Sequence, residues 1–215
     1  MTKNRLYAEL FPRGATTVPE LRKAAKIWAK RNALISPQEL EGLLIACITD
    51  PRPMVKCMGG ILLDYLPLQR KSLNPFLYEK WLDHVTGWGE IDAICYGHVT
   101  AEEMLADFTN WKRLLQTLSQ SENINKRRAA MVFLTKPVKH SQDLRLSKLA
   151  FSLIDTQKQE TSILITKAIS WVLRNLTKNH RHQVVSYLDS NKDLLPKIAI
   201  RETLNKLRTG RKSGV

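Results

Sequence analysis

The chain has 215 residues, of which 43% are hydrophobic and 25% are charged, so it fits one compact domain or a short array of helical repeats. No window approaches the roughly 18 uninterrupted apolar residues that a membrane span needs, so we expect a soluble protein that does not span a membrane. The N-terminal segment MTKNRLYAELFPRG lacks the apolar stretch of a secretory signal. We therefore expect a cytoplasmic protein.

The net charge of +14 is distributed unevenly along the chain. Residues 1–107 hold 13 Lys and Arg against 13 Asp and Glu, whereas residues 108–215 hold 21 against 7. A half of the chain with so large an excess of positive charge normally binds a polyanion. Nucleic acid and an anionic membrane surface are the candidates. The alternative is a basic surface that serves only solubility.

Apolar residues recur at helical spacing through most of the chain, and strand patterns are almost absent. Pro19, Pro37 and Pro75 stand where a first helical turn tolerates proline, and we expect Pro67 and Pro137 to stop the helices before them. The pattern predicts an all-α protein. The expected helices cover residues 20–31, 37–49, 55–66, 75–84, 88–99, 101–119, 125–134, 141–155, 159–178, 182–188 and 194–207.

Short connections between these helices favour consecutive antiparallel pairs with a period near 40 residues, the size of a HEAT-like repeat. We therefore predict a HEAT-like α-solenoid, an α-α superhelix, formed by one domain over residues 1–208. A flexible basic tail is expected over residues 209–215. The pairs show little similarity to one another, so an irregular helical bundle is the alternative.

Metal-binding and common enzyme motifs are weak or missing. The spacings of phosphate loops, dinucleotide-binding folds and zinc proteases do not occur. The three cysteines are odd in number and lack Cys-x-x-Cys spacing, which favours buried thiols. Cys95-x-x-His98 and His180-x-His182 each offer half of a metal site without a second pair. We expect a helix end and a surface turn there, and no metal or other cofactor.

One aromatic cluster surrounds a carboxylate. In the segment HVTGWGEIDAICYGHV, residues Trp88, Asp92 and Tyr96 are spaced i, i+4 and i+8, so on a helix they share one face. A carboxylate flanked by aromatic rings loses solvation and must be satisfied by hydrogen bonds or serve a purpose, such as facing a developing cation. The structural alternative is a buried Asp92 that caps a neighbouring helix.

Two further clusters are cationic. Lys167, Trp171, Arg174 and Lys178 follow helical spacing and place an indole within a basic stripe, which suits a phosphate backbone. Alternatively, Trp171 is a core residue with basic neighbours that extend past it to solvent. The second cluster contains three adjacent cations that point in different directions around a helix, so at least one must face inward or toward a concave surface. These residues are Lys126, Arg127 and Arg128.

These clusters also carry a resemblance to a known family. The segments WGEIDAI, KRRAAMVF and KAISWVLRNLTK, together with GATTVPELRKAAK near the N-terminus, are similar to motifs of the bacterial DNA alkylation repair family, the HEAT-like-repeat alkylpurine DNA glycosylases. The resemblance covers roughly residues 14–207. It implies an α-solenoid whose concave basic face binds duplex DNA. An open cleft on this face would excise positively charged alkylated purines.

Residue by residue, the resemblance assigns the cleft indoles to Trp88 and Trp171, the catalytic carboxylate to Asp92 and a DNA-contacting arginine to Arg128. The other cations of the two clusters are expected to bind DNA as well. A carboxylate near the sugar stabilises the positive charge that builds up when a glycosidic bond breaks, and it can orient or deprotonate water. An already cationic purine leaves without much help from a general acid.

The sequence thus predicts a monomeric DNA glycosylase that acts in base excision repair on double-stranded DNA with alkylated bases, in the cytoplasm at the nucleoid. Two alternatives remain. A non-catalytic DNA-binding relative would retain the basic groove without the chemistry. A helical-repeat scaffold for a protein partner would instead show an apolar concave side and scattered cations.

Overall fold

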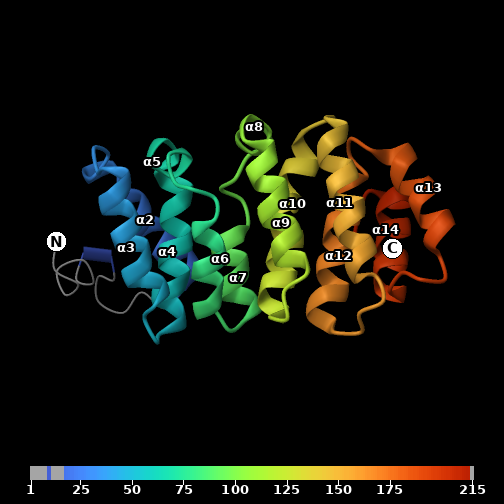
Figure 1. The fold of residues 1–215 in the computed structure, drawn as a ribbon, viewed down its shortest axis with the longest axis horizontal. Coiled ribbons are helices and arrows are strands. Elements are labelled where there is room, and N and C mark those ends of the chain that lie inside the picture. The colour runs from blue at the N-terminus through green and yellow to red at the C-terminus, as the bar shows by residue number, and fades with distance from the viewer. Residues whose placement is uncertain (1–8, 11–16, 214–215) are drawn as a thin grey trace. The chain divides into compact units, whose positions relative to one another are not determined.

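The computed structural model describes residues 9–10 and 17–213, which fall into two compact units, one ending at His98 and the other beginning at Val99. The described residues form helices and turns without any strand, which confirms the all-α prediction (Figure 1). No helix in this part of the chain is long and apolar enough to cross a membrane. Gly14 of the first family motif and the last two residues of the predicted tail lie outside the described residues.

The first unit is built around one buried helix. Its helices are α2 (Val18–Arg31), α3 (Pro37–Ile48), α4 (Pro53–Tyr65), α5 (Pro67–Lys71), α6 (Leu77–Trp81), the short 3-10 helix η1 (Leu82–His84) and α7 (Trp88–Cys95). Helix α4 packs against α2, α3 and α7 and is buried on every side from Val55 to Leu63. The central position of α4 makes it the support on which α7 rests.

Local signals explain where several of these helices begin. Ser36 caps α3, since its side chain accepts the Glu39 N–H while the Glu39 carboxylate accepts from the Ser36 N–H. Pro37 follows as the first helical residue, where its missing N–H costs nothing. Pro67 likewise ends α4 and begins α5, as expected from the sequence.

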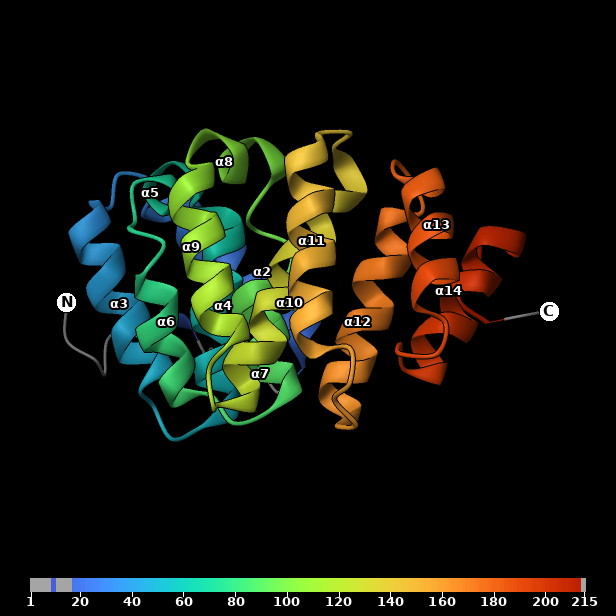
Figure 2. The same cartoon turned by 45° about the vertical axis from the view of Figure 1, so that its right-hand side comes forward.

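The second unit shows consecutive helix pairs in two layers. Its helices are α8 (Ala101–Ala106), α9 (Phe108–Ser119), α10 (Ile124–His140), α11 (Leu144–Gln157), α12 (Ile163–Leu176), α13 (Arg181–Asn191) and α14 (Lys197–Thr209). Helices α10, α12 and α14 pack on one another in sequence, while α9, α11 and α13 pack alongside them (Figure 2). This layering is what the repeat prediction expects. Gly210, with a φ of +73°, ends α14 where the predicted tail begins.

The prediction that Pro137 stops its helix is wrong. Helix α10 continues past this buried proline to His140. A proline inside a helix removes only its own backbone N–H donor, and carbonyl groups near the end of α10 and at its C-cap also accept bonds from outside the helix. Side chains from the end of α12 and the turn after it supply three such bonds, each 2.9 Å long. They join Asn175 Nδ2 to Thr135 O, Asn179 Nδ2 to Lys139 O, and His180 Nε2 to Ser141 O.

The prediction of one helix over residues 101–119 is also wrong. Asp107 leaves the helical conformation, with φ −127° and ψ 47°, and separates α8 from α9. Its carboxylate accepts from the side-chain amide of Asn110 at 3.0 Å, one turn into α9. The Asp107 side chain makes no cap bond to the backbone of α9, and the apolar spacing of the sequence gives no sign of this break.

Candidate functional site

Helix α7 carries the predicted carboxylate and the first indole. Trp88 is its first residue and is 64% exposed, which is unusual for so large an apolar side chain. Asp92 lies one turn further along the same side of the helix and is half-buried. Tyr96 follows the last helical residue, is 38% exposed, and donates its N–H to Asp92 O at 2.9 Å. The three residues therefore share one accessible side of α7.

The close approach of α7 to α4 depends on glycine. A Cβ atom added to Gly60 would lie 2.2 Å from Ala93 O and 2.7 Å from Ile94 N. Backbone atoms cannot move aside as a flexible side chain can, so only glycine fits here. Gly60 thus sets how closely the helix that bears Trp88 and Asp92 lies against its support.

A buried ion pair, which sequence reasoning missed, joins the same two helices. Lys56 of α4 is 9% exposed and Glu90 of α7 is 6% exposed, and their Nζ and Oε2 atoms lie 3.6 Å apart. Lys56 also donates to His84 O, and Glu90 accepts the Thr86 N–H at 3.0 Å. The one available signal was a lysine inside the apolar run VKCMGGILL.

Cys57 lies beside this pair. Its Sγ is 3.9 Å from Gly89 O, and burial, with a smaller contribution from the Glu90 charge, raises the pKa of the Cys57 thiol to about 11. A thiol with so high a pKa is a poor nucleophile near neutral pH. All three cysteines are buried and free, as the sequence predicts.

Helix α12 carries the predicted basic stripe in the second unit. Lys167 and Lys178 are exposed, whereas Trp171 and Arg174 are half-buried. Ser170, next to Trp171, is fully buried. The stripe is therefore exposed at its two ends and partly buried in its middle. Trp171 is neither a fully buried core residue nor a fully exposed one.

A second buried carboxylate, also missed from the sequence, holds the middle of this stripe. Glu202 of α14 accepts from Ser170 Oγ at 2.5 Å, and its Oε2 atom lies 3.4 Å from Arg174 Nε. Arg174 Nε in turn donates to Ser170 Oγ at 3.2 Å. Burial lowers the pKa of Arg174 and the Glu202 charge opposes that effect. Lys212 contacts the other Glu202 oxygen at 3.4 Å.

The three adjacent cations of α10 have three different environments, as their spacing predicts. Arg128 faces inward: it is only 6% exposed and donates through Nη1 to Leu164 O at 2.8 Å. Arg127 pairs with Glu160, with Nε and Oε1 2.6 Å apart. Lys126 is half-buried. The assignment of these residues to DNA binding stays a prediction.

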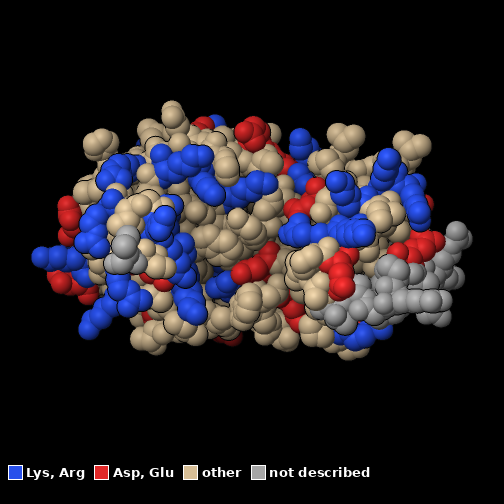
Figure 3. All heavy atoms as spheres, turned by 180° about the vertical axis from the view of Figure 1, so that it is seen from behind, with Lys and Arg blue, Asp and Glu red and all other residues tan. Residues whose placement is uncertain are grey.

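Exposed lysine and arginine side chains gather on the second unit, and Figure 3 shows many of them on one face. Such a surface attracts phosphates without regard to base sequence. The exposed cations of this unit are Lys112, Arg113, Lys139, Arg145, Lys148, Lys167, Lys178, Arg181, Lys192, Lys197, Arg201, Arg208, Arg211 and Lys212. The exposed acidic residues are fewer and comprise Glu102, Glu122, Asp155, Asp189 and Asp193.

The two candidate half-sites for a metal, Cys95 with His98 and His180 with His182, each contain a histidine that is packed within the fold. His98 is buried, and its Nε2 lies 3.0 Å from the Tyr78 hydroxyl. Cys95 is the last residue of α7, so the expected helix end is confirmed. His180 is buried at the start of α13, so the expectation of a surface turn is wrong at that residue. Within residues 9–10 and 17–213, no group of three or more His, Cys, Asp or Glu side chains is arranged to hold a metal ion.

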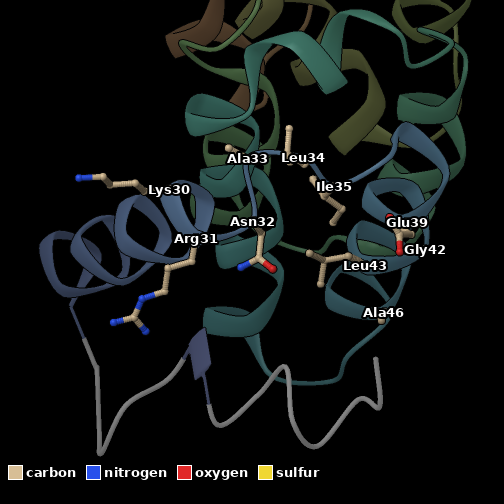
Figure 4. A pocket seen from close by; sticks show the side chains of 10 residues that line it. All are labelled: Lys30, Arg31, Asn32, Ala33, Leu34, Ile35, Glu39, Gly42, Leu43 and Ala46. Atoms are coloured by element: carbon tan, nitrogen blue, oxygen red, sulfur yellow. The ribbon is translucent and has the colours of Figure 1, made fainter.

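A pocket of about 950 Å³ in the first unit lies apart from the predicted site residues, between the end of α2 and the face of α3 (Figure 4). Ile35 and Leu43 line its apolar side, and the Lys30 and Arg31 side chains extend away from them. The acidic lining residue, Glu39, is already bonded to Ser36. The pocket therefore combines an apolar hollow with the charged side chains of Lys30, Arg31 and Glu39, and none of its described lining residues is a predicted site residue.

Comparison with known proteins identifies the family. The profile of the family described as DNA alkylation repair enzyme matches residues 5–207. No curated protein matches the sequence significantly. A solved structure, described as a predicted DNA alkylation repair enzyme from Enterococcus faecalis, is similar in fold, with a TM-score of 0.71 and 18% sequence identity over 90% of this chain and 87% of that one. Since the family profile spans almost the whole sequence, the chain belongs to the DNA alkylation repair enzyme family.

Proposed function

We propose that this protein is a DNA glycosylase that excises positively charged alkylated purines from duplex DNA. The observation that carries the proposal is the pairing on α7 of a highly exposed indole, Trp88, with a half-buried carboxylate, Asp92, one turn away. Family membership supplies the DNA context, since its description names alkylation repair. The exposed cations of the second unit would bind the phosphate backbone.

The chemistry follows from the charges involved. Alkylation on a ring nitrogen gives the purine a positive charge, and the bond from C1′ to the base breaks with its electron pair going to the base, which leaves neutral. The sugar becomes an oxocarbenium-like cation, which the Asp92 carboxylate stabilises. Water then adds at C1′ and gives its proton to Asp92. A second carboxylate is not required because the leaving group needs no protonation.

Trp88 would pack against the deoxyribose and the cationic base. A cation over an indole face is stabilised by about 0.5–2 kcal/mol, depending on desolvation. An exposed tryptophan can meet a lesion that remains in the duplex. The substrate class is therefore a cationic base in double-stranded DNA rather than a neutral one.

Base release from methylated duplex DNA under single-turnover conditions tests the proposal. Wild type should release cationic alkylpurines, and Asp92→Asn should reduce the rate by about 10²- to 10³-fold, since the amide keeps size but loses charge. Asp189→Asn, at an exposed position of α13, is the matched control and should retain the wild-type rate. Binding without base release by wild type would contradict the proposal and favour a non-catalytic DNA-binding relative.

A further inference from the structure

The segment that enters α7 is anchored to α4 by buried polar groups. Lys56 reaches both ends of the segment, the carbonyl of His84 and the carboxylate of Glu90. Glu90 closes the loop by accepting the Thr86 N–H at 3.0 Å. Trp88 lies in the middle of this closed segment. The backbone that carries the Trp88 indole is thus restrained on both sides of that residue.

The segment needs such an anchor because of its composition. Gly87 caps α7 and Gly89 is its second residue, and a Cβ atom added to either would meet nothing within 4 Å. These glycines contribute no packing, and glycine loses more backbone freedom on ordering than any other residue. The polar contacts of Lys56 and Glu90 therefore add to the restraints on this stretch, which also include the buried Val85 and the contact of Cys57 with Gly89 O.

Stability alone does not explain a buried ion pair at this place. Residues 55–63 of α4 are all buried, and Lys56 is the one charged residue among them. Replacing a buried pair by apolar residues is often neutral or stabilising, whereas removing one partner leaves an uncompensated charge. What an apolar pair lacks is direction: it cannot hold the His84 carbonyl or the Thr86 N–H at a fixed position.

We propose that Lys56 and Glu90 are positioning residues, which fix the segment 84–90 so that Trp88 and Asp92 are presented together to the substrate. The expected effect on base release rests on the proposed function. The expected effect on the order of segment 84–90 rests only on the contacts of Lys56 and Glu90. Neither residue is assigned a contact with substrate.

The test uses the full-length protein with three variants: Lys56→Met, Glu90→Gln, and the double variant Lys56→Met with Glu90→Met. Lys80→Met and Glu79→Gln on α6 are matched controls, because both change the same charges nearby outside this network. Three quantities are measured: the single-turnover rate of base release, the affinity for unmethylated duplex DNA, and amide hydrogen exchange across residues 84–92.

Lys56→Met should accelerate amide exchange over residues 84–92 and slow base release by about 10- to 100-fold, since small displacements of reacting groups have effects of this size. DNA affinity should stay within about twofold, because the cations proposed to bind phosphate belong to the second unit. Glu90→Gln keeps an acceptor for the Thr86 N–H but leaves Lys56 without its counter-charge, so its effect on exchange should be smaller. The two controls should resemble wild type.

The double variant separates positioning from stability. Its two apolar side chains should restore thermal stability to near the wild-type value while base release remains slow. If base release recovers together with stability, the pair is only structural and the inference is overturned. Unchanged amide exchange in Lys56→Met also overturns it. If wild type releases no base, the proposed function fails, while the exchange data still decide whether the pair anchors the segment.

Discussion

Helices α7 and α12 both carry an indole and both depend on a buried carboxylate, but the two carboxylates bind different things. Glu90 binds backbone at the start of α7 and pairs with Lys56, which is remote in sequence. Glu202 binds the side chains of α12 themselves, Ser170 and Arg174. In the first unit, the Glu90 carboxylate binds a backbone group at the start of α7 as well as Lys56. In the second unit, the Glu202 carboxylate binds the side chains of Ser170 and Arg174.

This difference suggests different tasks for the two units. A restrained backbone with a half-buried Asp92 suits a reaction in which distance to the sugar matters. A basic stripe in which Arg174 is held by Glu202 while Lys167 and Lys178 are exposed suits binding to a polyanion. We therefore expect changes near α7 to affect base release, and changes near α12 to affect DNA affinity and its salt dependence.

Among variants outside the proposed catalytic residues, the largest effect is expected from Gly60→Ala. The new Cβ would lie 2.2 Å from Ala93 O, so α7 must move away from α4. We expect the free energy of unfolding to fall by about 1–3 kcal/mol, typical of an overpacked core, and base release to fall by roughly 100-fold. Urea denaturation and single-turnover assays measure the two effects.

Gly42→Ala is the control for this variant. Gly42 lies within α3, and a Cβ atom there would meet nothing within 4 Å. Alanine should stabilise the helix by about 0.4–1 kcal/mol and leave base release unchanged. If Gly60→Ala behaves in the same way, close packing of α7 on α4 is unimportant for the site.

Glu202→Gln tests the second unit. It removes the charge that faces Arg174 and Lys212, so both cations become available to phosphate. The log-log salt slope of DNA binding should steepen by up to about two units, about one for each cation, while base release from bound substrate changes little. Asp189→Asn changes the net charge equally at an exposed position and should have a smaller effect. A loss of base release without altered binding would reverse the assignment of tasks.

Local patterns predicted much of this molecule. Helical periodicity and proline positions gave most helices, since amphipathic spacing and caps act within a few residues. Adjacency alone predicted that at least one of Lys126, Arg127 and Arg128 faces inward or toward a concave surface, and Arg128 faces inward. The spacing of Trp88 and Asp92 on one side of a helix was predicted for the same reason.

Features that depend on distant partners were not predictable. Lys56 bonds a carbonyl 28 residues away, and Ser170 bonds a carboxylate 32 residues away. Pro137 was read as a helix stop because its local effect is to remove a donor. Carbonyl groups on either side of Pro137, those of Thr135 and Lys139, accept bonds from Asn175 and Asn179, on or just beyond another helix. Patterns within a single sequence do not show which residues distant in the chain will contact one another.

The indoles provide a finer comparison. Trp88→Ala should slow release of a cationic base by about 2- to 30-fold, equivalent to about 0.5–2 kcal/mol of cation-to-ring interaction. Its unfolding free energy should change by no more than about 0.5 kcal/mol, because Trp88 is 64% exposed. Trp171→Ala should destabilise the fold more, since Trp171 is half-buried. Equal destabilisation in chemical denaturation would contradict this distinction.

The smallest effect concerns the thiol beside Glu90. Burial and the Glu90 charge raise the pKa of Cys57 from 9.0 to about 11, so the folded protein retains a proton that the unfolded chain releases. Stability from this group is complete below about pH 9 and is lost as the pH rises from about 9 to about 11. Cys57→Ala lacks this titration, so its denaturation midpoint should fall less than that of wild type over the same range. Groups such as lysines titrate equally in both proteins and cancel in the difference. Parallel pH dependences in wild type and Cys57→Ala would mean that Cys57 has an ordinary pKa and that the surroundings of Glu90 are more hydrated than the structure indicates.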